Sequence, residues 1–345
     1  MIFLGDIACP YEKVRDFIDT VSKIDAFKDE LIVLNLEANI LKEGEKQKPL
    51  TLYNASTVLD AFSKSKDVVV SLANNHTYDY PEKIQRTIDI LESRNIKCFG
   101  VSNGKQNDPL EIEVDGVKMA FFGHCWRLYT HTNNNNENHI RVNDSFYDDF
   151  VRDVKDYVNK HPLTKVYCFM HWNYDGEKLT MPMHRKIAHD LIDDGVEAVI
   201  GSHSHRPQGA EFYKGKPIVY GLGNFYLPSG VYFEGKLTYP DFSKETYALR
   251  IDGDKSELIW FDTDKGTIPI KQSCKESLDG LRIRELSPFL EMDEHSYVSY
   301  FKKHRSKSFL VPVFDNYVGY KYKLKETMAI VRVRIIKTIL KILKR

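Results

Sequence analysis

The chain has 345 residues, which is enough for one large domain or for one domain with an appendage, and enough to bury the core that an enzyme needs. Its 49 basic residues balance its 49 acidic ones, so the sequence lacks the excess positive charge typical of nucleic-acid-binding proteins, and we expect no nucleic-acid partner. The five cysteines are an odd number without a CxxC pair, which indicates free thiols in a reducing compartment rather than a disulfide framework.

Short apolar runs alternate with helix-like stretches from residue 1 to about residue 225, and this pattern of βα units predicts an α/β fold. The predicted strands, in chain order, are 2–4, 31–34, 68–72, 119–122, 166–170, 198–200 and 218–220. The predicted helices are 11–27, 55–62, 81–94 and 182–193, and the last two open with a proline suited to a first helical turn.

The pattern changes in the later part of the chain. Two strand-like runs around Asp252-Gly253-Asp254-Lys255 predict a hairpin over 245–263. The polar stretch 131–139 predicts a surface loop, and residues 266–320 have no pattern that we can interpret. We therefore predict a domain over 1–265, followed by a C-terminal extension over 266–345.

The chain ends in a basic amphipathic helix. From Lys321 to Arg345 there are nine basic residues and one acid, Glu326, while apolar residues recur at helical spacing. Such a helix is typical of peripheral binding to an anionic membrane surface, with a helix packed on this protein or on a partner as the alternative. Because the start of the sequence lacks the features of a signal peptide, we expect a cytoplasmic protein that binds peripherally to the inner face of the membrane.

Polar side chains follow one predicted strand after another. Asp6 follows the first strand, Glu37 the second, and Asn75 with His76 the third. His171 follows the strand that ends at residue 170, and His203 with His205 follow the strand that ends at residue 200. Since ligands bind outside the carboxyl ends of the strands in open α/β sheets, we expect these side chains to converge in one cleft.

Three imidazoles, two carboxylates and an amide in one cleft predict a metal site. Mixed nitrogen and oxygen ligands suit divalent ions such as Mn, Fe or Zn. A carboxylate has two oxygens and can bridge two ions, and such a pair clamps a phosphate while it activates water. The sequence therefore predicts one or two divalent metal ions.

At this point the sequence resembles a known family. Leu4-Gly5-Asp6, Asn35-Leu36-Glu37, Leu72-Ala73-Asn74-Asn75-His76 with Asp79, His171-Trp172, Gly201-Ser202-His203-Ser204-His205 and Leu222-Gly223-Asn224-Phe225 stand in the order seen in CapA-type capsule synthesis proteins (PGA_cap), which are similar to calcineurin-like metallophosphoesterases. The resemblance spans residues 1 to about 265 and implies a four-layer αββα sandwich.

The resemblance also implies a role for each motif residue. Asp6 and His205 would hold the first metal, and Glu37 would bridge both metals. Asn75, His171 and His203 would hold the second metal, and His76 would act on the substrate as a general acid or bind its phosphate. The chain departs from classical phosphoesterases in having Ala8 two residues after the first aspartate, where they have a histidine, and in using Glu37 where an aspartate is customary. The first metal site is therefore poorer in ligands.

Two further residues are predicted to assist the reaction. Asp79 is three residues past His76 and is interpreted as a carboxylate that fixes a histidine ring, with a helix N-cap ahead of Pro81 as the alternative. Arg206 follows His205 and is interpreted as a clamp for an anionic group, with a surface salt bridge as the alternative.

These patterns favour a metal-dependent hydrolase of phosphoesterase type in capsule or other cell-surface polymer synthesis, acting on a phosphorylated or polymeric surface glycan. Two alternatives stay open. One is a non-catalytic component of a polymer synthase, and the other is an enzyme that cleaves an amide, as in poly-γ-glutamate metabolism.

Overall fold

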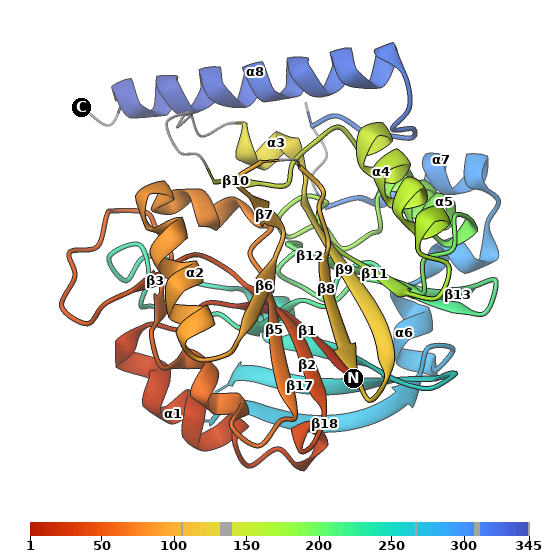
Figure 1. The fold of residues 1–345 in the computed structure, drawn as a ribbon. Helices are drawn as coiled ribbons and strands as arrows, with labels where there is room; N and C mark the ends of the chain where they lie inside the picture. Colours follow the sequence, from red (N-terminus) through yellow and green to blue (C-terminus); the bar gives the residue numbers. More distant parts are fainter. Residues whose placement is uncertain (105, 132–139, 266–267, 307–310, 344–345) are drawn as a thin grey trace.

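Two β-sheets face each other at the centre of the molecule (Figure 1). The computed structural model describes residues 1–104, 106–131, 140–265, 268–306 and 311–343. The first sheet has the order β18-β17-β16-β1-β2-β5-β6, with β15 paired to β1, and the second has the order β13-β14-β12-β11-β9-β8.

The strands of the first sheet are β1 (Ile2–Ile7), β2 (Leu31–Leu36), β5 (Asp67–Ser71), β6 (Lys97–Phe99), β15 (Asn224–Tyr226), β16 (Glu245–Asp252), β17 (Lys255–Lys265) and β18 (Ile268–Ser277). Those of the second are β8 (Leu110–Val114), β9 (Val117–Cys125), β11 (Lys165–His171), β12 (Ala198–Ser202), β13 (Ala210–Tyr213) and β14 (Lys216–Val219). Two short pairs lie apart from them, β3 (Ile40–Leu41) with β4 (Asn54–Ala55), and β7 (Val101–Ser102) with β10 (Arg141–Val142).

Side-chain alternation along the strands builds the core. Phe3 of β1 points between the sheets, where its ring meets Phe121 and Tyr167 of the second sheet. Its neighbours Ile2 and Leu4 point to the other face of the first sheet. Both faces of the central strands are therefore buried, which explains why these strands are almost wholly apolar in sequence.

Helices cover both outer faces. Helices α1 (Tyr11–Val21) and α2 (Ile84–Ser93) cover the first sheet, and α4 (Tyr147–Lys160), α5 (Pro182–Asp193) and α7 (Glu294–His304) lie on the second (Figure 1). Short helices α3 (Arg127–Thr130) and α6 (Leu281–Glu285) lie in connections, and α8 (Tyr320–Leu343) ends the fold. The predicted four-layer αββα sandwich is confirmed.

The predicted elements agree with the structure in most places. All seven predicted strands and the hairpin over 245–263 are present, and the helix over 182–193 is confirmed. The helix predicted over 55–62 is wrong, because residue 55 ends β4 and residues 58–62 form a 3-10 helix. Four of those five residues are buried, so this segment has no polar face for a solvent-exposed α-helix.

The first sheet and the outer core continue past residue 265. Strand β18 pairs with β17 in antiparallel fashion. Phe289, Tyr297 and Phe301 join the core outside the second sheet. The segment without a readable pattern is thus held by pairing with the preceding strand β17 and by packing against residues far away in the chain.

One face of α8 packs on the domain. Tyr322, Glu326, Ala329 and Ile330 of this helix are buried. On the opposite face, a stripe of apolar side chains is exposed, which we call the α8 stripe: Leu324, Met328, Val331, Ile335 and Ile339. The structure therefore contains both the predicted helix and the packing on this protein that was its alternative.

Among the described residues, the helices are all too short or too polar to span a bilayer. The polar stretch predicted as a surface loop falls, from residue 132 to 139, outside the described residues.

Candidate metal centre

The predicted ligands meet where the two sheets end on the same side. Asp6 is the second-to-last residue of β1. Glu37 directly follows β2, which runs parallel to β1. His171 is the last residue of β11, and the loop with His203 and His205 follows the parallel strand β12. All five side chains are buried.

These side chains form two groups that share one carboxylate. Candidate ligand atoms of Asp6, Glu37 and His205 lie within 4.8 Å of one another, and so do those of Glu37, His171 and His203. The structure thus brings together two trios with Glu37 common to both, which is the arrangement a bridging carboxylate needs.

The backbone of the histidine loop is constrained to present its rings. His203 and His205 adopt positive φ angles of 84° and 53°. Residues other than glycine rarely adopt positive φ, and those that do are concentrated at functional sites. The backbone N–H of His203 donates to Asp6 Oδ2 at 3.1 Å. On the strand before the loop, residue 201 has to be a glycine, because a Cβ there would lie 2.1 Å from the carbonyl oxygen of Tyr220.

Amide side chains position the ligands. Asn35 donates from Nδ2 to Asp6 Oδ1 at 2.7 Å, and Asn224 Oδ1 lies 2.8 Å from His205 Nδ1. Asn75 Oδ1 lies 2.7 Å from His171 Nε2 and so belongs to the second group. Our sequence reasoning missed Asn35 and Asn224 as site residues, although both stand in the motifs that carry the family resemblance.

Buried polar atoms without partners mark the place of a cation. Both carboxylate oxygens of Glu37 and both ring nitrogens of His203 have no hydrogen-bond partner among the described residues. Leaving such atoms unpaired costs on the order of 1–3 kcal/mol each, and more for a charged group. These residues fit a divalent ion, because coordination would satisfy these atoms.

The electrostatics support the same interpretation. Burial, together with the charges of Asp6, Asp175 and Asp79, raises the pKa of Glu37 well above its ordinary value. Burial and the neighbouring histidines hold the pKa of His203 well below its ordinary value. A cation would favour both the ionised carboxylate and the neutral imidazole.

His76 lies at the edge of the site with a carboxylate behind it. Its Nδ1 is 2.8 Å from Asp79 Oδ2, and its Nε2 is 3.9 Å from Glu37 Oε1. Asp79 Oδ2 also accepts from the backbone N–H of Leu52 at 2.8 Å. The N-cap of the helical turn at Pro81 is Tyr80, without a side-chain cap bond, so Asp79 is a partner of His76 and not the helix cap.

Arg206 contacts the ring of Phe242. Its guanidinium lies 4.2 Å from the centroid of the Phe242 ring, and burial lowers its pKa while the charge of Glu177 opposes that shift. Its part in binding an anion stays a prediction. Two tyrosine rings contact the histidine loop. The ring centroid of Tyr129, in the short helix α3, lies 4.0 Å from that of His203, and the ring centroid of Tyr239, in a loop, lies 5.6 Å from that of His205. No sequence signal pointed to either tyrosine.

Comparison with known proteins identifies the family. A family model described as "Bacterial capsule synthesis protein PGA_cap" matches residues 5–229. Over 239 residues the chain is 26% identical to a "probable polyglutamine synthesis accessory protein" of Mycobacterium tuberculosis, covering 64% of this chain and 61% of the relative. It is 24% identical to the capsule biosynthesis protein CapA of Bacillus anthracis, covering 64% of this chain and 54% of the relative. The chain thus spans less than two thirds of these relatives.

Among solved structures, a hypothetical protein from Thermus thermophilus has a TM-score of 0.47 at 16% identity, covering 79% of this chain and 99% of that one. NAD nucleotidase from Haemophilus influenzae has a TM-score of 0.36 at 11% identity, covering 84% of this chain and 54% of that one. The family model spans well over half of the chain and includes all the predicted site residues. The chain therefore belongs to the PGA_cap family of bacterial capsule synthesis proteins.

Proposed function

We propose that this chain is a metal-dependent hydrolase of phosphoesterase type that acts in the synthesis of capsule or another cell-surface polymer. The observation that carries the proposal is Glu37, a fully buried carboxylate without a hydrogen-bond partner among the described residues and shared by two trios of ligands. The substrate of this hydrolase would be a phosphorylated surface glycan or a precursor of such a glycan.

In this proposal Asp6 and His205 hold one divalent ion, Asn75, His171 and His203 hold another, and Glu37 bridges the two. Manganese, iron and zinc match this donor set. Two such ions, when bound, supply positive charge that stabilises a phosphoryl group and acidifies water.

The proposed role of His76 is to hold a proton for the leaving oxygen. Asp79 accepts a hydrogen bond from Nδ1–H, which fixes the ring and leaves Nε2 as the nitrogen that exchanges a proton with the substrate. That nitrogen lies 3.9 Å from Glu37 Oε1, the carboxylate shared by the two groups. The His76 side chain keeps 18% exposure, so a substrate can reach it.

Metal analysis and turnover together test the proposal. We expect wild-type protein to contain one or two ions per chain and to hydrolyse phosphomonoesters or phosphodiesters with manganese. His203→Ala should lower the metal content and reduce turnover at least about a hundredfold, because it removes a ligand. His161→Ala, an exposed histidine elsewhere, is the matched control. Equal metal content and turnover in both variants would contradict the assignment.

The alternative of a non-catalytic or amide-cleaving component has its own support. The mycobacterial relative is described as an accessory protein, and Ala8 leaves the first trio without the extra histidine of classical phosphoesterases. A screen of the manganese-loaded protein against phosphomonoesters, phosphodiesters and γ-glutamyl amides separates the functions. Turnover of amides alone would replace the phosphoesterase proposal, and no turnover with metal bound would favour the non-catalytic one.

We further propose that the α8 stripe lies on an anionic membrane surface. The acid in this basic segment, Glu326, is buried, so it does not oppose headgroup binding. Flotation with anionic liposomes tests this: Ile335→Asp should reduce co-flotation, since it places a charge in the apolar stripe. Unchanged flotation, or equal flotation with neutral liposomes, would contradict membrane binding through this face.

A further inference from the structure

An apolar pocket of about 420 Å³ lies between α8 and the body of the domain. Leu128 of α3 and Tyr174 line it from the domain, while Ala329, Val333 and Ile336 line it from α8. Figure 1 shows α8 passing over α3 at the top of the molecule. The volume is within the range of pockets that hold small ligands.

The pocket shares two residues with the surroundings of the metal centre. Tyr129 lines the pocket, and its ring lies 4.0 Å from the ring of His203. Asp175 also lines the pocket, and its charge contributes to the raised pKa of Glu37. A ligand in the pocket would therefore be separated from the metal ligands by about one side chain.

We infer that this pocket binds the apolar part of a substrate whose phosphate lies at the metal centre, so that the substrate is the phosphate ester of a lipid-like alcohol. The inference rests on the proposed function. In the reaction, water forms a new P–O bond, the ester P–O bond breaks, and the leaving alcohol oxygen takes a proton from His76, while the proton that the water loses restores the one given by His76. The products are the free alcohol and inorganic phosphate.

The lining decides between substrate classes. An apolar group leaves water on entering such a pocket and is stabilised by burial. A polyglutamate chain or a sugar would instead lose hydration to apolar walls. The lining has one carboxylate, Asp175, and one guanidinium, Arg332, so it offers a polyanion no net attraction.

A path for a longer chain continues from the pocket. Ile336 lines the pocket and is also 41% exposed, so the apolar lining reaches the surface of α8. From there it adjoins the α8 stripe at Ile335, which is 54% exposed. An alkyl chain longer than the pocket would therefore leave along an apolar surface.

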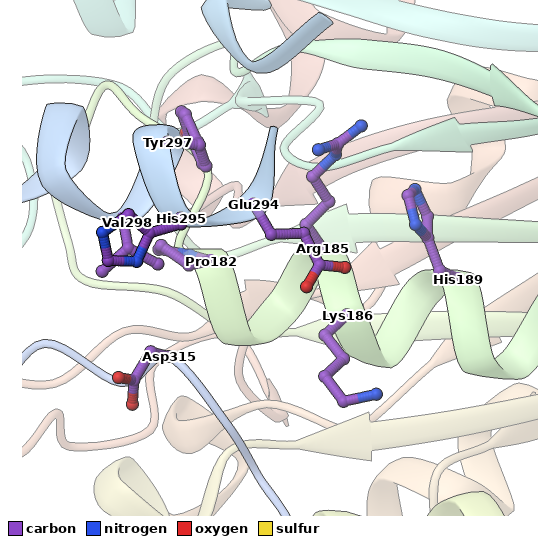
Figure 2. Close-up of a pocket in the computed structure, with 9 residues that line it drawn as sticks. All are labelled: Pro182, Arg185, Lys186, His189, Glu294, His295, Tyr297, Val298 and Asp315. Atoms are coloured by element: carbon purple, nitrogen blue, oxygen red, sulfur yellow. The ribbon is translucent and has the colours of Figure 1, made fainter. Parts of the chain in front are cut away.

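A second pocket, of about 290 Å³ between α5 and α7, has a different character (Figure 2). Its lining includes Arg185, Lys186 and Glu294. Arg185 is held by Glu211 at 2.9 Å and Lys186 by Asp190 at 2.9 Å, so both cations are already paired. This pocket shares no lining residue with the metal centre, so we assign it no part in binding the substrate.

The test compares methyl, butyl and octyl phosphate as substrates of the manganese-loaded protein, and the corresponding alkylphosphonates as ligands in calorimetry. We expect kcat/KM and phosphonate affinity to rise with chain length, by up to about fourfold per buried methylene. Chain-length independence in both measurements would overturn the inference.

Two adjacent residues provide a matched pair of variants. Ile336→Asn should reduce the octyl-to-methyl ratio of both kcat/KM and affinity at least about fivefold, because it places an amide in the pocket wall. Ile335→Asn, on the same helix but outside the lining, should leave that ratio unchanged. Both positions are exposed, so both variants should fold. Equal effects of the two variants would overturn the assignment of the pocket.

The outcomes also separate this inference from the proposed function. Chain-length-dependent phosphonate binding that Ile336→Asn weakens, without turnover of any ester, would support the pocket and contradict the hydrolase. Turnover without chain-length dependence would support the hydrolase and contradict the pocket.

Discussion

Replacing Glu37 by glutamine should stabilise the metal-free protein. The Glu37 carboxylate is fully buried, and within the described part of the chain nothing donates a hydrogen bond to either oxygen. Glutamine has nearly the same shape and carries no charge. The substitution therefore removes the cost of a buried, unpaired carboxylate.

The size of the effect follows from the pKa of Glu37, which is raised well above its ordinary value of 4.5. A carboxyl group whose pKa is higher in the folded state gives its full stability below pH 4.5 and loses it as pH rises toward the folded pKa. The loss is about 1.4 kcal/mol per pH unit, or up to about 3 kcal/mol at pH 7. For 345 residues this corresponds to a rise in Tm of about 4 °C in the variant.

Glu177 provides the matched control. It is as deeply buried as Glu37, but its Oε1 accepts from the backbone N–H of Leu179 at 3.1 Å, and both its oxygens accept from that of Ser306. Glutamine would place its NH2 group at one of these two oxygen positions, where it faces a backbone N–H donor. We therefore expect Glu177→Gln to lower the free energy of unfolding by about 1–3 kcal/mol.

The assay is thermal unfolding of chelator-treated protein between pH 5 and 8, repeated with manganese. Without metal, the Tm of Glu37→Gln should exceed that of the wild type, and the difference should widen as pH rises. With manganese at a thousand times its dissociation constant, binding stabilises the wild type by about 4.1 kcal/mol, which exceeds the difference of up to about 3 kcal/mol, so the order should reverse. If Glu37→Gln lowers the metal-free Tm as Glu177→Gln does, the reasoning from an unpartnered carboxylate is refuted.

Three further substitutions test other parts of the structure. Asp79→Asn should lower kcat about tenfold or more with little change in KM and shift the pH–rate profile, because His76 loses the carboxylate at its Nδ1. Asn224→Ala should weaken manganese binding about 10–100-fold in calorimetry, because it frees the ring of His205. Glu326→Ala should lower the free energy of unfolding, measured with urea, by about 3–5 kcal/mol. It removes the buried carboxylate by which α8 binds Trp126 and Arg127.

Each of these expectations has a contradicting result. An unchanged pH–rate profile for Asp79→Asn would show that the carboxylate does not orient the histidine. Wild-type manganese affinity in Asn224→Ala would show that the amide has no part in holding a ligand. Thr327→Ala, at an exposed position beside Glu326, is the control for α8, and equal destabilisation by both variants would contradict the anchoring role.

The sequence predicted the metal groups because their geometry depends on strand order. Asp6, Glu37 and His171 each stand at or just past the carboxyl end of a parallel strand, so the position of the strand places the side chain. An apolar run that is buried on both faces is easy to recognise, and so are the polar residues that end it. The fold class and the ligand groups come from the same signal.

The residues around the metal groups could not be predicted in this way. Tyr129 lies in the four-residue helix α3 and Asp175 in a turn, and their places depend on packing between parts of the chain far apart in sequence. Arg206 shows the reverse case. It is next to His205 in the chain, yet its side chain turns to Phe242, since adjacent residues in a loop do not share a direction.

Composition alone does not show which cations of the C-terminal helix hold it to the domain. Lys323 pairs with Asp148 at 2.9 Å, and Arg334 donates to the carbonyl oxygen of His131, so part of the charge fixes α8 to the domain. Lys321 is exposed beside the α8 stripe and remains available to headgroups. A helix held in this way keeps the wall of the apolar pocket in place while it presents its opposite face outward. If that face rests on a membrane, a lipid-like phosphate ester would reach the metal centre without its chain crossing water, which explains why the pocket opens toward the stripe.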